Sequence, residues 1–372
     1  MHDVTISADS HITEAPDTYT AHIASKWRDR APVLKDMGEK AGDMFVIDGM
    51  SKPVPMGLVA AAGKPAEEIR IMGARFDDLH RSGWDPKARR ADQIRDGVDA
   101  EIIYPTVGMV LCNHPDLDYK KACFDAYNLW IAEYCSADPA RLLGCGQTAI
   151  RTPEEGIEDL RKIKALGLRG VMMPGMPGQE DYDSTIYDGF WEAAIDLELP
   201  LSFHILTMSS GPTRGPKMNG FLSIVRGCQD IMGTLVLGGV FERHPKLKVV
   251  CAEADAGWVP HYMYRLDHAF KRHRNWLPPG QDLSKLPSEY FAENIYTTFQ
   301  DDWVAFKVAD LMNWKRLMWA NDFPHSDSTW PWSQDMLKEH ASGLTDEQRR
   351  HILGLNVAEL YSIDLAALEE AA

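Results

Sequence analysis

The chain has few cysteines and fewer basic than acidic residues, and both features restrict the classes of protein and partner that it can have. Its 6 cysteines include no Cys-x-x-Cys pair and most lie in apolar surroundings, so we expect buried, reduced thiols. Its 39 Lys and Arg residues against 55 Asp and Glu give a net charge of −16, which argues against nucleic acid and anionic membranes as partners. The N-terminus has no basic segment followed by an apolar stretch, and no uninterrupted apolar run approaches membrane-spanning length. We therefore expect a cytoplasmic protein.

Short apolar runs alternate with amphipathic stretches along almost all 372 residues, which is typical of a parallel α/β fold. The apolar runs predict strands at 4–8, 100–104, 142–148, 170–173, 199–204, 247–251, 295–298 and 317–320. The amphipathic stretches predict helices at 88–96, 119–137, 152–166, 188–197, 220–243, 260–274, 302–312 and 345–362. Eight strand–helix units predict a (β/α)8 TIM barrel, with residues 1–372 forming a single domain.

Two segments do not fit the barrel repeat. Residues 15–85 separate the first two strands with more chain than a crossover needs, and they predict an insertion with a small hairpin at 44–55 and a partly helical stretch at 57–72. Insertions after a barrel strand lie on the active-site face, so we expect this one to roof the pocket. Residues 207–218, rich in Gly, Ser, Pro and Thr, predict a mobile loop directly after His204.

Side chains that bind metals stand at the ends of several predicted strands. Asp9 and His11 follow the first strand, His204 ends the fifth, Glu253 follows the sixth and Asp322 follows the last. A parallel barrel places the C-terminal ends of all its strands on one face, so we expect these residues to converge. Alternation along a strand directs Asp9 and His11 to the same side. Imidazole with carboxylate is a ligand set for zinc, manganese or iron.

Further residues around these positions are candidates for the chemistry. Asp322 can bind a metal and also accept a proton from bound water, and His325 follows it as a hydrogen-bond partner, a proton shuttle or a ligand of a second ion. Glu14 is the other candidate for a second ion, and Asp255 is expected to cap the next helix. Apolar and aromatic residues expected to line the pocket are Tyr104, Met173, Trp258 and Trp330.

Residues 9–14 (DSHITE), His204, residues 253–258 (EADAGW) and residues 321–327 (NDFPHSD) resemble the amidohydrolase superfamily. The resemblance is to its amidohydrolase-related branch, which includes aminocarboxymuconate semialdehyde decarboxylase, and it covers nearly the whole chain. It implies a (β/α)8 barrel with a divalent metal. It also implies that Asp9 and His11 match the first-strand pair of that branch, His204 its fifth-strand His and Asp322 its last-strand Asp.

The chain departs from that branch at two places. Glu253 stands where the decarboxylases usually carry a His, and the fourth strand, 170–173, has no Lys to form a bridging carbamate. The missing Lys favours one ion, whereas the surplus ligands Glu253, Glu14 and His325 leave two Mn or Fe ions open.

The expected function is metal-dependent hydrolysis or decarboxylation of a small carboxylated or cyclic compound, with Asp322 and His325 as catalytic residues. One alternative is a dinuclear Mn/Fe oxygenase, a hydroxylase similar to the aminoisobutyrate hydroxylase proteins. The other is a non-catalytic, metal-bearing subunit of a hetero-oligomer. We expect a small-molecule substrate and either a homo- or a hetero-oligomer.

Overall fold

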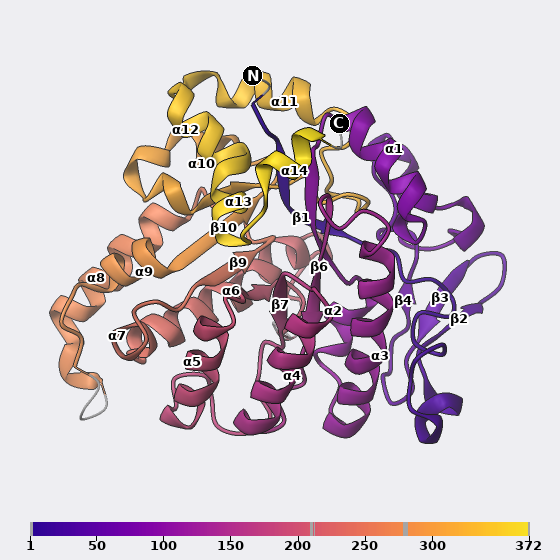
Figure 1. Cartoon of the computed structure of the whole chain (residues 1–372), viewed down its shortest axis with the longest axis horizontal. Helices are drawn as coiled ribbons and strands as arrows, with labels where there is room; N and C mark the ends of the chain where they lie inside the picture. Colours follow the sequence, from indigo (N-terminus) through magenta and orange to yellow (C-terminus); the bar gives the residue numbers. More distant parts are fainter. Residues whose placement is uncertain (1–2, 209–210, 212, 278–281, 371–372) are drawn as a thin grey trace.

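The computed structural model describes residues 3–208, 211, 213–277 and 282–370. Its main sheet has eight strands in the order β1-β5-β6-β7-β8-β9-β10-β11, and neighbouring strands pair in parallel, so the predicted TIM barrel is confirmed (Figure 1). The strands are β1 Ile6–His11, β5 Ala100–Tyr104, β6 Leu142–Gln147, β7 Gly170–Met173, β8 Leu201–His204, β9 Val249–Ala252, β10 Ile295–Phe299 and β11 Leu317–Trp319.

Every residue of these strands is buried, because one face of the sheet fills the barrel interior and the other meets the helices. Glycines in β6 allow the helices to approach closely. A Cβ at Gly144 would lie 2.9 Å from Ile131, and one at Gly146 would lie 2.8 Å from Ile163, so larger residues would push these helices away.

The helices surround the sheet (Figure 1). They are α1 Pro86–Asp96, α2 Val107–Leu111, α3 Leu117–Cys135, α4 Pro153–Ala165, α5 Asp188–Asp196, α6 Asn219–Leu237, α7 Val240–Arg243, α8 Val259–His273, α9 Pro287–Asn294, α10 Trp303–Lys307, α11 Ser333–His340, α12 Asp346–Arg350, α13 Asn356–Leu360 and α14 Leu365–Glu370. The helix predicted at 220–243 is two helices, because Gly239 adopts a left-handed φ of 72° between them. The helix predicted at 345–362 contains a π-helical turn, His351–Leu355.

The insertion contains a three-stranded antiparallel sheet, β2 Val33–Asp36, β3 Asp43–Val46 and β4 Val54–Pro55. The predicted hairpin is therefore confirmed and β2 is an addition to it. Of the partly helical stretch predicted at 57–72, only the 3-10 turn Ala66–Glu68 forms. The insertion packs beside α3, where the Tyr119 hydroxyl donates to the Arg30 carbonyl at 2.7 Å (Figure 1). The loop predicted at 207–218 lies partly outside the described residues.

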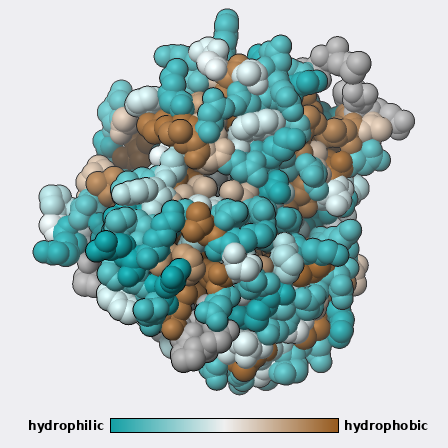
Figure 2. All heavy atoms as spheres, turned by 90° about the vertical axis from the view of Figure 1, so that its left-hand side faces the viewer, coloured by the Kyte–Doolittle hydropathy of each residue, from teal (hydrophilic) through white to brown (hydrophobic). Residues whose placement is uncertain are grey.

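One described helix, α6, is long and apolar enough to cross a membrane by length and composition, and 44% of its most apolar window is buried. It packs against β8 and β9, and a core helix of a barrel passes the same test, so this finding alone places no part of the chain in a membrane. Figure 2 shows the side of the molecule around α8 and α9, where hydrophilic residues predominate and hydrophobic residues form separate patches.

Candidate metal centre

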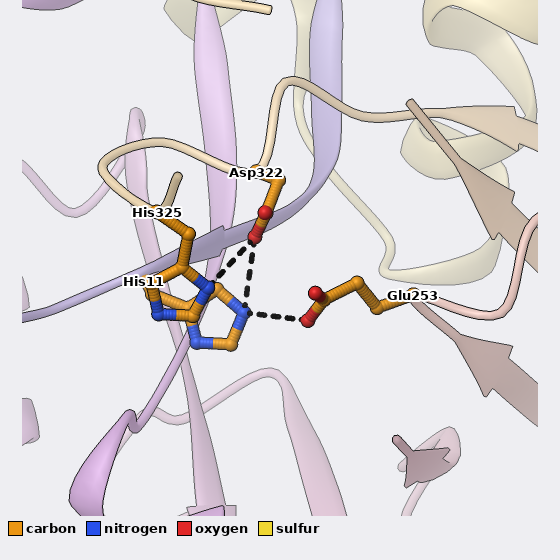
Figure 3. A group of neighbouring side chains, drawn as sticks. All are labelled: His11, Glu253, Asp322 and His325. Atoms are coloured by element: carbon orange, nitrogen blue, oxygen red, sulfur yellow. Dashed lines mark ion pairs between the residues drawn. The ribbon is translucent and has the colours of Figure 1, made fainter. Parts of the chain in front are cut away.

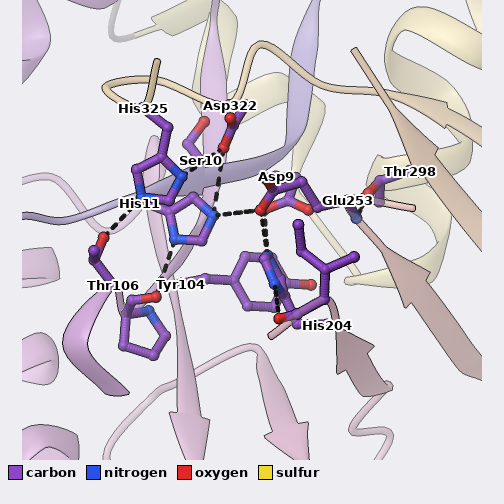
Figure 4. A network of polar contacts seen from close by, with 12 residues as sticks. Asp9, Ser10, His11, Tyr104, Thr106, His204, Glu253, Thr298, Asp322 and His325 are labelled. Atoms are coloured by element: carbon purple, nitrogen blue, oxygen red, sulfur yellow. Dashed lines mark hydrogen bonds and ion pairs between the residues drawn. The ribbon is translucent and has the colours of Figure 1, made fainter. Parts of the chain in front are cut away.

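The five predicted ligand residues meet at the C-terminal ends of the barrel strands (Figure 4). Asp9 and His11 belong to β1 and His204 ends β8, whereas Glu253 and Asp322 lie in the turns after β9 and β11. Glu253 and Asp322 have left-handed φ angles of 54° and 51°. Such angles are unfavourable for non-glycine residues and gather at functional sites.

The facing atoms are spaced like neighbouring ligands of one ion. The Nε2 atom of His11 lies 3.4 Å from Asp9 Oδ1, 3.5 Å from Glu253 Oε2 and 3.5 Å from Asp322 Oδ1. The Nε2 atom of His204 lies 3.4 Å from Asp9 Oδ1 and 3.2 Å from Glu253 Oε2. Metal–ligand bonds of about 2.0–2.2 Å set neighbouring ligand atoms about 3.0–3.5 Å apart. The atoms form two clusters that share His11: one with Asp9 and His204, the other with Glu253, Asp322 and His325. Within each cluster all ligand atoms lie within 4.8 Å of one another.

None of these five atoms has a hydrogen-bond partner, although all are buried. Burying polar atoms without partners is costly, and such groups call for an explanation. Among the described residues, the ion pairs of Asp9, Glu253 and Asp322 are with histidines and none is with a Lys or Arg. Two imidazoles thus face three carboxylates, of which Asp9 and Asp322 are fully buried and Glu253 is 10% exposed, and such a set suits a bound divalent cation.

Backbone carbonyls fix the orientation of both imidazoles. The Nδ1 atom of His11 lies 3.0 Å from the Pro105 carbonyl, and Nδ1 of His204 lies 3.0 Å from the Ile205 carbonyl. A carbonyl oxygen only accepts hydrogen bonds, so Nδ1 donates in both rings. In the neutral form each Nε2 then carries a lone pair directed into the site, as a metal ligand requires.

The site's electrostatics depend on burial and on the crowding of carboxylates. Burial lowers the pKa of His11, but the facing carboxylates of Asp9 and Glu253 outweigh it and raise that pKa to about 9. Burial raises the pKa of Asp9, whereas His204 and His11 bring it below its ordinary value. Burial, together with the charges of Glu253 and Asp9, raises the pKa of Asp322 well above its usual range. Without a metal, the site therefore retains protons that a bound ion would displace.

His325 lies next to Asp322 and stacks on His11, with ring centroids 3.9 Å apart (Figure 3). Its Nδ1 atom is 3.1 Å from Asp322 Oδ1, and its Nε2 atom is 2.9 Å from the Thr106 hydroxyl. That hydroxyl donates its proton to the Ile12 carbonyl at 2.6 Å, so Nε2 of His325 is the donor to Thr106. Burial, His11 and His204 lower the pKa of His325, so the neutral ring presents the Nδ1 lone pair to Asp322.

Glu14 is buried but does not join the clustered ligand atoms. Its Oε1 atom accepts hydrogen bonds from the amides of Thr106 and Gly108, both at 3.1 Å.

The prediction that Asp255 caps a helix is wrong, because Trp258 precedes α8 and makes no side-chain cap. Burial and the charge of Asp302 raise the pKa of Asp255 to about 7.

The residues expected to line the pocket have different surroundings. The Tyr104 ring lies 6.0 Å from the His11 ring and 5.2 Å from the His204 ring, so it is adjacent to the site. The Trp258 indole donates to the Ala254 carbonyl at 2.7 Å. Met173 is buried, and Trp330 is in a small apolar cluster with Ala62 and Phe323. Their role in a pocket stays a prediction.

Two residues that support the ligands were not predicted from the sequence. The Thr298 hydroxyl in β10 donates to Asp9 Oδ2 at 3.0 Å and accepts from the Glu253 amide at 2.7 Å (Figure 4). The Arg89 guanidinium in α1 donates to the His11 carbonyl at 2.6 Å. Thr298 also stands near a strand end, which is a signal that could have identified it. No sequence pattern around Arg89 indicates a role near the ligands.

The sequence model of the amidohydrolase family matches residues 47–363, so the chain belongs to this family. A relative from Dictyostelium discoideum, 2-amino-3-carboxymuconate-6-semialdehyde decarboxylase, is 25% identical over 304 residues, covering 80% of this chain and 82% of that protein. The predictions of the family and of an enzyme in this superfamily are thereby confirmed.

Solved structures resemble the chain over nearly its full length. An amidohydrolase from Mycobacterium avium subsp. paratuberculosis superposes with a TM-score of 0.77 at 20% identity, covering 97% of this chain and 100% of that one. A 5-carboxyvanillate decarboxylase from Novosphingobium aromaticivorans, in complex with manganese and 4-hydroxy-3-methoxy-5-nitrobenzoic acid, gives 0.69 at 18% identity and 96% coverage of both chains. These likenesses support the barrel fold. Together with the clustered donor groups, they agree with the predicted divalent metal.

Proposed function

We propose that this chain is a metal-dependent decarboxylase of a small carboxylated aromatic or related unsaturated compound. The observation that carries the proposal is the convergence of five unpartnered, buried ligand atoms, whose contacts with His11 and His204 have the spacing of neighbouring metal ligands. We assign Asp9, His11, His204, Glu253 and Asp322 as the metal-binding residues. When bound, the metal supplies Lewis-acid polarisation of a substrate oxygen and offsets the charge of the carboxylates.

Decarboxylation breaks a carbon–carboxylate bond and forms a carbon–hydrogen bond, so a proton must reach the substrate carbon. We assign that role to Asp322, because its carboxyl group borders the site and contacts His325, a partner for proton transfer. His325 is its relay partner, since its Nδ1 atom faces Asp322 Oδ1 at 3.1 Å. Thr106 holds the ring from the other side and so keeps Nδ1 directed at Asp322.

The proposed class of substrate is inferred from the compounds in the names of similar proteins. The Dictyostelium relative is named as a decarboxylase of an amino-carboxymuconate semialdehyde, and the Novosphingobium structure as a decarboxylase of carboxyvanillate. Both substrates carry a carboxylate on an unsaturated carbon skeleton. Hydrolysis by the same residues, with Asp322 as base, remains the alternative if no such compound loses CO2.

We also propose that residues 15–85 roof this site. The Ser326 amide donates to the Leu58 carbonyl at 2.9 Å, and the Ala62 amide donates to the Pro324 carbonyl at 3.1 Å. The insertion is thus hydrogen-bonded on both sides of His325, in the loop that follows Asp322. Deleting these contacts by shortening the insertion would expose that loop to water.

The proposal is tested by metal analysis and CO2 release. Protein purified without added metal should contain about one divalent ion per chain and release CO2 from at least one member of a panel of hydroxylated benzoates. His204→Ala should lose both properties. About two equivalents of Mn or Fe with consumption of O2 would instead favour the dinuclear oxygenase. A full metal site without turnover of any compound would favour the non-catalytic subunit.

A further inference from the structure

Three of the five proposed ligands lie where the first and last barrel strands meet. The Asp322 amide donates to the Asp9 carbonyl at 3.0 Å, and the His11 amide donates to the Phe323 carbonyl at 2.7 Å. We call this contact between residues 9–11 and 321–323 the seam. Any shift of one side of the seam against the other would change the spacing of Asp9, His11 and Asp322.

Arg89 of α1 bridges the two sides of the seam. Its side chain is completely buried. Nη1 donates to the His11 carbonyl at 2.6 Å, and Nη2 donates to the Phe323 carbonyl at 3.3 Å. The guanidinium also lies 4.8 Å from the centroid of the Phe323 ring. The Phe323 carbonyl thus accepts from the His11 amide on one side and from Arg89 on the other.

Glu101 of β5 fixes the orientation of this guanidinium. Arg89 Nε donates to Glu101 Oε2 at 2.7 Å, and Nη2 donates to Glu101 Oε1 at 3.1 Å, a two-point contact. Gln93 donates to Oε2 at 2.8 Å, and Ser10, between the two β1 ligands, donates to Oε1 at 3.2 Å. Buried ion pairs give little net stability because desolvation offsets their attraction, so stability alone is a weak reason for this pair.

We infer that Arg89 is a positioning residue for the metal site. It acts through the backbone of His11 and Phe323, and so sets the distance between His11 and Asp322 across the seam. This inference rests on the proposed function, because it assumes that these residues bind the metal. Groups that orient metal ligands typically change metal affinity about 10- to 100-fold when they are replaced.

The test is the Mn2+ affinity of the full-length, metal-free chain carrying Arg89→Lys, measured by titration. Lysine keeps the charge but lacks the planar fork, so it cannot reach Glu101 and both carbonyls together. We expect the dissociation constant for Mn2+ to rise about 10- to 100-fold. Unfolding by denaturant, without metal, measures the loss of stability separately.

Arg141 provides the matched control, because it is also a buried arginine that binds backbone carbonyls. It precedes β6 at the opposite end of the barrel and donates to the carbonyls of Asp99 at 2.9 Å and Leu368 at 2.6 Å. Arg141→Lys should lower the free energy of unfolding and leave Mn2+ affinity unchanged. Unchanged affinity in Arg89→Lys, or an equal loss in Arg141→Lys, would overturn the inference.

A second variant covers the case in which Arg89→Lys does not fold. Glu101→Gln leaves Arg89 in place but replaces one carboxylate acceptor with an amide NH2, so the two-point contact is lost. We expect Mn2+ affinity to fall about tenfold in this variant, and no change would overturn the inference. A parent chain that binds no Mn2+ would refute the proposed function itself, whereas normal binding by both the parent and the Arg89 variant refutes only the role of Arg89.

Discussion

Metal binding by this chain should depend steeply on pH, because a bound ion must displace a proton from His11. The carboxylates of Asp9 and Glu253 raise the pKa of the metal-free His11 to about 9. At pH 7 only about one His11 in a hundred then has a free Nε2 lone pair, which weakens apparent affinity about 100-fold, or about 2.7 kcal/mol. The raised pKa of Asp322 acts in the same direction.

The assay is a chelator-competition titration with Mn2+ between pH 6.5 and 8.5. The logarithm of the association constant should rise by at least about one per pH unit, and calorimetry in two buffers should detect at least about one proton released per ion. His325→Gln is the control and should keep this slope, because the pKa of His325 is lowered and its ring is already neutral. A flat profile without proton release would refute the reasoning.

The same pKa has the opposite effect on the metal-free fold. A group whose pKa is higher in the folded chain stabilises it fully below its unfolded value, near 6.5, and loses that contribution as pH rises through about 9. The free energy of unfolding of the metal-free protein should therefore decline by about 3 kcal/mol over this window. Denaturant melts at pH 6 and pH 9 measure the difference, and equal stabilities at both would contradict the assignment.

Substitutions at three positions test individual residues. His204→Ala should remove the metal while leaving the circular dichroism spectrum intact, since apolar strand residues form the barrel core; full metal occupancy would exclude His204 as a ligand. Thr298→Val should lower the free energy of unfolding by about 1–3 kcal/mol, because the partly buried Glu253 amide loses its acceptor, and Thr298→Ser should restore most of it. Glu253→Gln should weaken binding of about one ion per chain; a fall from about two Mn or Fe equivalents would instead support the oxygenase.

The sequence was most informative where a side chain follows directly from its place on a strand. Asp9, His11 and His204 are in the barrel strands, so apolar runs located them, and the topology of a parallel barrel predicted their convergence. Glu253 and Asp322 lie just beyond their strands, and their left-handed backbone could not be read from residue type.

Local sequence patterns could not predict the contacts that Thr298 and Arg89 make with the ligand residues and their neighbours. Thr298 and Asp9 are 289 residues apart, and Arg89 meets the Phe323 carbonyl across 234 residues, so these pairs depend on how the barrel closes. The prediction for Asp255 failed for a similar reason. Asp302, from the loop after another strand, accepts from the Ala256 and Gly257 amides and takes the place that a local cap would fill.

The left-handed backbone at Glu253 and Asp322 lowers the stability of the fold at two positions that the proposed function requires. Each of these conformations costs of order 1–3 kcal/mol for a non-glycine residue, and asparagine tolerates it better than glutamate does. Asparagine at position 253 would therefore relax the chain and also remove a buried charge, so mutation selected for thermal stability alone should drift towards it. Thermostability screens of this barrel, if run without metal, should accordingly enrich variants that no longer bind it.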